Sequence, residues 1–271
     1  MLRTRVITAL LLVAGLALIL FAMPPLAAVL AFAAIAALAA WEWGGLMKQD
    51  QPARLMYAFV LLLFCWQLTV AAPNLVPFLL GLSVAFWILI VPLWFRFKWR
   101  LAGNDFFGYL LGAVVILPTW AAMVALHAVS TWLMLAVMAL VWVADITAYF
   151  AGRAFGKHKL APTISPGKTW EGVAGAVVGV LIYGAIVLSL SPLGALLTDR
   201  LPFAVPLLAM MLVLLTAVSV MGDLFESLLK RQAGIKDSSN LLPGHGGVLD
   251  RIDALTSTLP LAALIMYSVR S

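Results

Sequence analysis

The chain has 271 residues, of which 65% are hydrophobic and only 10% are charged. A soluble domain carries about 25% charged residues, so this chain lacks the polar surface that a water-facing globule needs. Its apolar runs are continuous, which argues against the alternating strands of a membrane β-barrel. The composition therefore predicts an all-α, polytopic integral membrane protein with about nine transmembrane helices.

Nine apolar segments follow one another, with lengths that suit helices crossing a bilayer. The first is expected to be a retained span rather than a cleaved signal peptide, because a second run follows directly after Pro24 and Pro25. The last begins with charged residues. The segments lie at about 6–22, 26–47, 55–72, 75–95, 106–126, 130–152, 170–190, 203–228 and 252–269.

The basic residues are distributed unevenly among the connections. If the N-terminus is cytoplasmic and the spans alternate, 15 of the 17 Lys and Arg residues fall on the cytoplasmic side, and only Arg200 and Arg270 fall on the other. This bias predicts a cytoplasmic N-terminus. It also places two polar segments, about 153–169 and 229–251, on the same cytoplasmic face. The net charge of +6 thus indicates topology and contact with anionic lipid rather than with nucleic acid.

The position of these polar segments divides the chain at residue 105. Residues 1–105 are expected to form a scaffold of transmembrane helices, and residues 106–271 are expected to carry cytoplasmic catalytic loops between further helices. The single cysteine, Cys65, excludes an intramolecular disulfide.

Ionisable side chains inside apolar segments are costly and therefore mark candidate functional sites. Asp145 lies in an apolar span, and we interpret it as a cavity-facing acid that meets a cation. Asp223 and Glu226 are three residues apart and share one helix face, but Glu226 also has an ion-pair partner four residues further on, in Lys230. Glu42 lies between two tryptophans, which leaves open a functional role or a position at the membrane interface.

A second pair of acids, Asp250 and Asp253, has the same three-residue spacing at the predicted start of the last helix. One of them is explained as a helix cap, because acids are favoured at helix N-termini. Two caps are not expected, so both remain candidates for contact with a metal ion or with substrate.

The first polar segment, Gly152–Gly172, contains the sequence Ser-Pro-Gly-Lys-Thr. It resembles part of a phosphate-binding P-loop, but the upstream glycine of GxxxxGK[ST] is missing and no strand is predicted before it, so a Walker A site is excluded. Backbone N–H groups at the start of the next helix, with Lys168 and Thr169, still suit an anion. The alternative is a segment whose positive charge serves topology alone.

The second polar segment, Lys230–Asp253, combines bases, acids and glycines. Three glycines surround His245 and allow the backbone to approach a ligand closely. Carboxylates such as that of Asp237 suit Mg²⁺ and the bases suit phosphate, so the segment indicates a magnesium–polyphosphate ligand. Zinc is less suitable, because a lone histidine without cysteine is a poor ligand set. A turn residue or a simple hydrogen-bond partner is the alternative for His245.

The stretch from Ser227 to Asp253 resembles the signature of the phosphatidate cytidylyltransferases, also called CDP-diacylglycerol synthases. The segment Ser165–Gly172 is similar to a second conserved segment of that family, in which Lys is more common where Gly167 stands here. The fixed positions of the signature are present at Ser227, Lys230, Arg231, Lys236, Asp237, His245, Gly246, Gly247, Asp250, Arg251 and Asp253.

The resemblance implies that CTP and phosphatidic acid give CDP-diacylglycerol and pyrophosphate, with Mg²⁺ as the cofactor. It implies a multi-pass protein of the bacterial inner membrane whose active site faces the cytoplasm, with CTP, phosphatidic acid and the bilayer as partners. Metal ligands are expected at Asp223 and Asp250, with Asp145 added as an auxiliary ligand. The number of metal ions and the oligomeric state, a homodimer included, are left open.

The candidate residues are divided into two groups by chemistry. The catalytic group is Asp223, Lys236, Asp237, Asp250 and Asp253. The substrate-binding group is Arg153, Ser165, Lys168, Thr169, Ser227, Lys230, Arg231, His245, Gly246, Gly247 and Arg251.

Three other functions are weighed against this one. A CTP-dependent lipid-alcohol kinase of the same superfamily would release CDP instead of pyrophosphate. A cation transporter would use the intramembrane acids as an ion path, but apart from Asp199 no acids continue toward the opposite side. A scaffold protein would leave the second polar segment unexplained.

Overall fold

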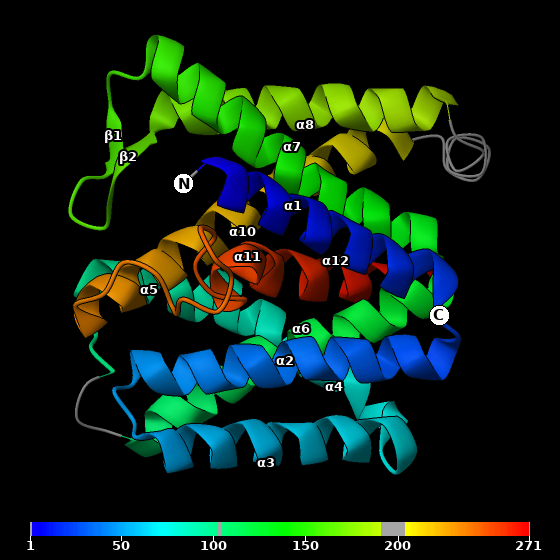
Figure 1. Ribbon diagram of the computed structural model, residues 1–271. Coiled ribbons are helices and arrows are strands. Elements are labelled where there is room, and N and C mark those ends of the chain that lie inside the picture. Colours follow the sequence, from blue (N-terminus) through cyan, green and yellow to red (C-terminus); the bar gives the residue numbers. More distant parts are fainter. Residues whose placement is uncertain (1, 102–104, 191–203, 271) are drawn as a thin grey trace.

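The computed structural model describes residues 2–101, 105–190 and 204–270, and nearly all of them are helical (Figure 1). The π-helical stretches Leu18–Ala22 and Phe86–Ile90 continue α1 and α4, and the 3₁₀ turn Pro73–Leu75 precedes α4. The helices are α1 (Leu2–Ala17), α2 (Pro25–Leu46), α3 (Gln51–Val70), α4 (Val76–Ala85), α5 (Val91–Phe97), α6 (Asp105–Val129), α7 (Thr131–Phe155), α8 (Trp170–Leu190), α10 (Ala204–Ala233), α11 (Leu249–Ile252) and α12 (Leu255–Arg270).

Within the described residues, eight helical segments are long and apolar enough to cross a membrane. They match the first eight predicted segments and confirm the prediction of an all-α polytopic membrane protein. The ninth, the apolar stretch Leu255–Val269 of α12, is shorter. At 1.5 Å per residue, a helix of this size spans about 24 Å, less than the roughly 30 Å of a bilayer core.

The connections between helices gather at two opposite ends of the bundle (Figure 1). One end carries the N-terminus, the turn between α2 and α3, the segment between α7 and α8, and the segment between α10 and α11. The C-terminus lies at the other end. The two polar segments are therefore neighbours at one end, as the charge distribution predicted. Asp199, Arg200 and the side chain of Arg270 lie outside the described residues.

The first polar segment contains a small antiparallel hairpin of β1 (Lys159–Ala161) and β2 (Ser165–Thr169). The N–H of Trp170 also donates to the carbonyl of His158 at 2.9 Å, which closes the base of the hairpin. The expectation that no strand precedes Ser-Pro-Gly-Lys-Thr was wrong, because β1 lies before it. Strands this short carry no readable alternation, and the hairpin is held because its ends continue into α7 and α8, which pack together.

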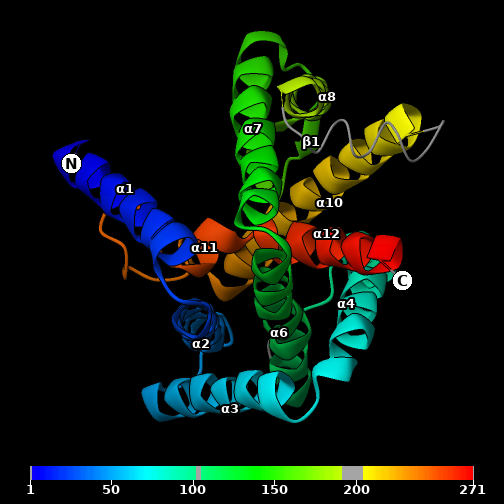
Figure 2. The same ribbon diagram turned by 90° about the vertical axis from the view of Figure 1, so that its right-hand side faces the viewer.

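Helix α12 lies inside the bundle against α4, α6, α7 and α10 (Figure 2). Pro260 has no N–H, so the carbonyl of Thr256, four residues earlier, lacks its helical partner. The indole N–H of Trp87 donates to that carbonyl instead at 3.1 Å, and the hydroxyl of Thr119 on α6 lies 3.3 Å from it. These contacts fix α12, and with it the residues that precede α12 in the second polar segment.

Helices α10 and α12 approach each other closely at Gly222. A Cβ at this position would lie 2.5 Å from the Ser257 hydroxyl and 2.8 Å from the carbonyl oxygen of Asp253. The Ser257 hydroxyl donates to the carbonyl of Val218 at 2.8 Å, which links the same two helices. The absence of a side chain at Gly222 therefore brings Asp223 close to Asp253.

Candidate functional site

The first polar segment contacts α10, the helix that leads into the second polar segment, at the end of the bundle that is predicted to be cytoplasmic. The ammonium of Lys168 on β2 forms an ion pair with Oδ2 of Asp223 on α10 at 2.5 Å. Both side chains are about a quarter exposed, so the pair lies at the edge of the protein interior. A base and an acid that are 55 residues apart in the chain thus face each other, as one continuous site requires.

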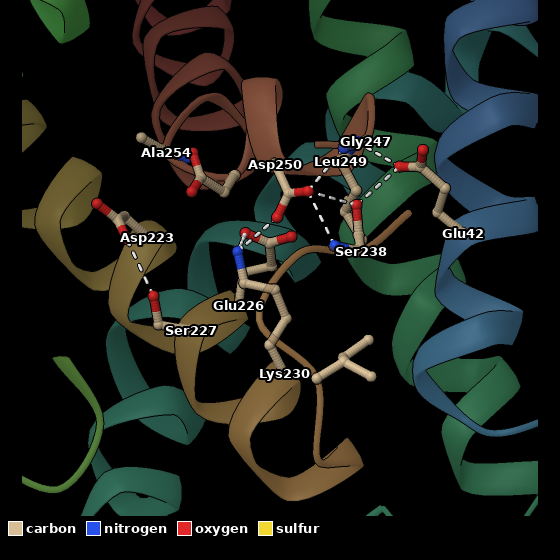
Figure 3. Close-up of polar contacts among 12 residues, drawn as sticks. Glu42, Asp223, Glu226, Ser227, Lys230, Ser238, Gly247, Leu249, Asp250 and Ala254 are labelled. Carbon is tan, nitrogen blue, oxygen red and sulfur yellow. Dashed lines mark hydrogen bonds and ion pairs between the residues drawn. The ribbon is translucent and has the colours of Figure 1, made fainter. Parts of the chain in front are cut away.

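Both oxygens of Asp250 accept hydrogen bonds from the protein (Figure 3). Its Oδ1 accepts a hydrogen bond from Lys230 Nζ at 2.6 Å. Its Oδ2 accepts from the backbone N–H groups of Ser238 (2.8 Å) and Gly247 (2.7 Å) and from the Ser238 hydroxyl (2.9 Å). Burial by itself raises the pKa of the Asp250 carboxyl, but these bonds, led by that from Lys230, bring the pKa below its ordinary value.

Lys230 is buried between two carboxylates. Its ammonium donates to Oε2 of Glu226 at 2.9 Å as well as to Asp250, and its side chain is only 11% exposed. The local ion pair between Glu226 and Lys230, which was the alternative explanation for Glu226, is therefore present. Asp250 of α11 joins this pair as a third member. In this arrangement Lys230 ties α10 to the second polar segment, while its predicted contact with a phosphate stays a prediction.

The glycines of the second polar segment are required by the protein's own geometry. Gly246 has φ +81°, and a Cβ there would lie 2.6 Å from Oδ2 of Asp250. Gly244 has φ +78°. The turn is closed by hydrogen bonds of 2.8 Å from Leu242 N–H to the Gly246 carbonyl and from His245 N–H to the Leu242 carbonyl. These glycines shape the loop that surrounds Asp250.

A second group of acids lies beside the buried pair of Lys230 and Asp250. Burial and the charge of Asp223 raise the pKa of Asp253 to about 7. Asp145 on α7 is within electrostatic reach of Asp223, Lys168 and Arg251. The structure therefore brings Asp145, Asp223 and Asp253 from three separate elements to one region.

The donor chemistry of this region suits Mg²⁺, which prefers carboxylate oxygens. Oε1 of Glu226 is buried there without a hydrogen-bond partner. Even so, among the described residues no three His, Cys, Asp or Glu side chains converge closely enough to hold a metal ion. Lys168 occupies one oxygen of Asp223, and Asp250 is bonded to the loop. The metal ligands Asp223, Asp250 and Asp145 therefore stay a prediction.

The other predicted site residues fall into a solvent-facing set and an anchoring set. The exposed side chains belong to Arg153, Arg231, Lys236, Asp237 and Arg251. Thr169 is buried, and its hydroxyl accepts from the N–H of Gly172 at 3.1 Å, which caps the start of α8. The Ser227 hydroxyl donates to Asp223 at 3.3 Å. Nδ1 of His245 is buried without a hydrogen-bond partner, and Ser165 is half-buried on β2.

The sequence profile of the Cytidylyltransferase family matches residues 3–269 of the chain. The chain belongs to the cytidylyltransferase family. A phosphatidate cytidylyltransferase of Pseudomonas aeruginosa is 41% identical over 252 residues, covering 87% of this chain and 86% of the relative. One of Haemophilus influenzae is 36% identical over 292 aligned positions, covering 99% and 100%. One of Staphylococcus saprophyticus is 41% identical over 129 residues, covering 48% and 46%.

This membership confirms the family that the signature indicated. The sequence of this family member nevertheless did not indicate two anchoring residues, Ser238 and Ser239, and it left the role of Glu42 open. Glu42 is fully buried and reaches the second polar segment from α2. Its place in an apolar helix was a signal, but its bonding partners lie about 200 residues away and no local pattern indicates them.

Proposed function

We propose that this protein is a phosphatidate cytidylyltransferase, which makes CDP-diacylglycerol and pyrophosphate from CTP and phosphatidic acid. The observation that carries the proposal is the ion pair that joins Lys168 of the first polar segment to Asp223 of α10, the helix that leads into the second polar segment, at one end of an apolar bundle. Two relatives that carry this name, aligned over most of both chains, support it.

The proposed reaction exchanges one phosphoanhydride for another. A phosphate oxygen of phosphatidic acid attacks the α-phosphorus of CTP, the new P–O bond forms, and the bond from the α-phosphorus to the bridging oxygen breaks as pyrophosphate leaves. The nucleophile is already anionic, so the main obstacle is repulsion between phosphates and charge on the leaving group. Fixed positive charge is therefore the principal requirement.

The exposed bases are suited to provide that charge. Lys168 of the first polar segment lies at the edge of the site, and Lys236 and Arg251 of the second polar segment face the solvent. Lys230 and Asp250 hold each other in the interior and keep α10 and α11 in register beneath the exposed groups. We assign phosphate contact to the exposed bases and organisation of the site to the buried pair.

We propose Mg²⁺ as the cofactor, held by Asp223 with Asp145 and Asp250 as the other carboxylates of the set. When bound, the ion would supply positive charge at the phosphates and the leaving group. The ion pair between Lys168 and Asp223 neutralises that carboxylate in its absence. Lys168 would have to release Asp223 as metal and nucleotide bind, which frees its ammonium for a phosphate.

The lipid chains need a path that stays within the bilayer. Of the residues of α1 whose burial is described, only Thr8 is buried, and its hydroxyl donates to the carbonyl of Pro243 at 2.9 Å. Beside this contact, an apolar cavity of about 440 Å³ is lined by Ile7, Leu11 and Leu242 among others. The residues that line this cavity form an apolar wall next to the second polar segment.

We propose that the site faces the cytoplasm of a bacterial inner membrane, where CTP is present and basic loops are favoured.

The proposal is tested with purified protein, radiolabelled CTP, phosphatidic acid and Mg²⁺ in mixed micelles, with EDTA as a control. A CMP-bearing lipid and released pyrophosphate are expected, and EDTA should suppress both. Release of CDP with a lipid alcohol as acceptor would instead identify a lipid-alcohol kinase. Absence of any CMP-bearing lipid would overturn the proposal.

A further inference from the structure

Glu42 is a fully buried carboxylate that bonds only to the second polar segment in the hydrogen bonds described for it. It lies near the end of α2, in the part of the chain expected to be scaffold. Oε1 accepts from the Ser239 hydroxyl (2.6 Å) and from Val248 N–H (2.9 Å). Oε2 accepts from Leu249 N–H (2.6 Å) and lies 3.1 Å from the Ser238 hydroxyl, whose single hydrogen it shares with Oδ2 of Asp250. Oε1 thus receives one hydroxyl and one backbone donor, whereas Oε2 receives one backbone donor and a share of the Ser238 hydroxyl; Figure 3 shows Glu42 beside Ser238 and Leu249.

This carboxylate has no ion pair among the described residues. Arg54 lies within electrostatic range but forms no ion pair with Glu42: its Nε donates to the carbonyl of Trp41 at 2.9 Å, and its guanidinium lies 3.8 Å from the centre of the Trp41 ring. A buried charge without a partner is unfavourable unless hydrogen bonds replace its hydration. Three donors from the second polar segment, with the shared Ser238 hydroxyl, therefore stabilise Glu42, and Glu42 in turn holds those donors.

Glu42 and Asp250 hold the same loop from opposite sides. The Ser238 hydroxyl lies between them, 3.1 Å from Glu42 Oε2 and 2.9 Å from Asp250 Oδ2. Gly247 also lies between them: its N–H donates to Asp250, and a Cβ there would collide with the Glu42 carboxylate. Movement of Glu42 would thus be transmitted to the bonds that orient Asp250.

We infer that Glu42 is a positioning residue for the proposed reaction, which fixes the loop of residues 238–249 so that Asp250 and Lys230 are held in register. The inference rests on the proposed function. It also assigns a role to the first part of the chain: α2 completes the site from outside the segment that carries the signature.

The test compares Glu42→Gln with Glu42→Asp in the full-length protein. An amide replaces one oxygen by an NH₂ group, which must face either Val248 N–H or Leu249 N–H, and neither backbone donor can turn away. Glu42→Asp keeps both oxygens but withdraws them by one methylene. Asp50→Ala is the matched control, because it removes the cap of α3, where Asp50 accepts from Ala53 N–H at 3.0 Å, without touching the loop.

Activity is measured with CTP and phosphatidic acid well below the unfolding midpoint of each variant. Glu42→Gln should lose about tenfold or more in kcat/KM for CTP, Glu42→Asp should recover part of that loss, and Asp50→Ala should stay within about twofold of wild type. Amide hydrogen exchange should accelerate in residues 238–250 of Glu42→Gln and remain unchanged in α6 and α7.

A folded Glu42→Gln protein with wild-type kcat/KM, or one whose hydrogen exchange rises equally in all helices, would overturn the inference. If wild-type protein makes no CMP-bearing lipid, the proposed function fails, whereas the exchange experiment still decides whether Glu42 holds the loop. Should the Glu42→Gln variant not fold, Ser239→Ala is used instead, because it removes the hydroxyl that donates to Oε1 of Glu42. Local acceleration of exchange with reduced activity then supports the role, and wild-type behaviour refutes it.

Discussion

Replacing Asp250 by Asn removes the carboxylate that joins α10, α11 and the loop between them. In the native protein Oδ1 accepts from Lys230, and Oδ2 accepts from the N–H groups of Ser238 and Gly247. An amide has an acceptor on one side only. In one orientation its NH₂ faces the Lys230 ammonium, and in the other it faces two backbone N–H groups, so no rotation satisfies every donor.

The magnitude follows from burial. The side chains of Asp250 and Lys230 are 3% and 11% exposed, so solvent screening is weak. Removing one member of a buried ion pair costs about 3–5 kcal/mol. Glu226 remains on Lys230 at 2.9 Å and offsets part of that cost. We therefore expect the free energy of unfolding to fall by about 3 kcal/mol.

The assay is equilibrium unfolding in mixed micelles at pH 7 without Mg²⁺, followed by tryptophan fluorescence and circular dichroism. Asp237→Asn, an exposed acid of the same segment, should change the free energy of unfolding by less than about 0.5 kcal/mol. In a double-mutant cycle with Lys230→Met, the two changes should couple by more than about 1 kcal/mol. An Asp250→Asn protein as stable as the Asp237→Asn control would refute the anchoring role.

The same carboxylate predicts a pH dependence. Because its pKa in the folded protein lies below the ordinary value of about 3.9, its contribution is fully present above that value and is lost as the pH falls through the folded pKa. The stability difference between wild type and Asp250→Asn should therefore be constant from about pH 7 to 5 and shrink below about pH 4. A difference that grows on acidification would contradict the assigned direction of the pKa.

Three further substitutions test the site and its support. Asp223→Asn should lower Mg²⁺-dependent turnover about tenfold or more while circular dichroism stays unchanged, since this acid is partly exposed; near-normal turnover would remove it from the ligand set. Gly246→Ala should cost about 1–3 kcal/mol in unfolding experiments, because φ is +81° and the new methyl meets Asp250; an unchanged unfolding midpoint would show that the turn adapts. Gly222→Ala should destabilise by about 1–3 kcal/mol and lower activity, because its Cβ would lie 2.8 Å from the Asp253 carbonyl. A stable but inactive Gly222→Ala protein would show that helix spacing affects the site alone.

The membrane fold could be predicted because its signals are local. Continuous apolar runs, proline breaks and the uneven distribution of Lys and Arg are properties of short windows, and eight of the nine predicted spans are described as helices that are long enough to cross a membrane. The joint position of the two polar segments also followed, since alternation of spans assigns every connection to one side. The hairpin between α7 and α8 was missed because strands of three and five residues leave no pattern.

The candidate site was predicted by residue type and less well by role. Lys230 and Asp250 were expected to contact phosphate and metal separately, whereas the structure bonds them to each other. Thr169 was expected at the substrate, and its hydroxyl caps α8. A charged or hydroxyl side chain reveals that it needs a partner, but the sequence does not show whether that partner is a ligand or the protein itself.

The amino-acid sequence by itself determined that the chain spans a membrane, which segments are polar, and which chemistry those segments suit. Only the tertiary structure decided how the buried charges are satisfied. Glu42 shows the physical reason: a carboxylate removed from water must take its donors from whatever backbone and side chains packing brings near. Here those donors belong to residues 196 to 207 positions away, and close packing at glycines such as Gly247 makes that approach geometrically feasible.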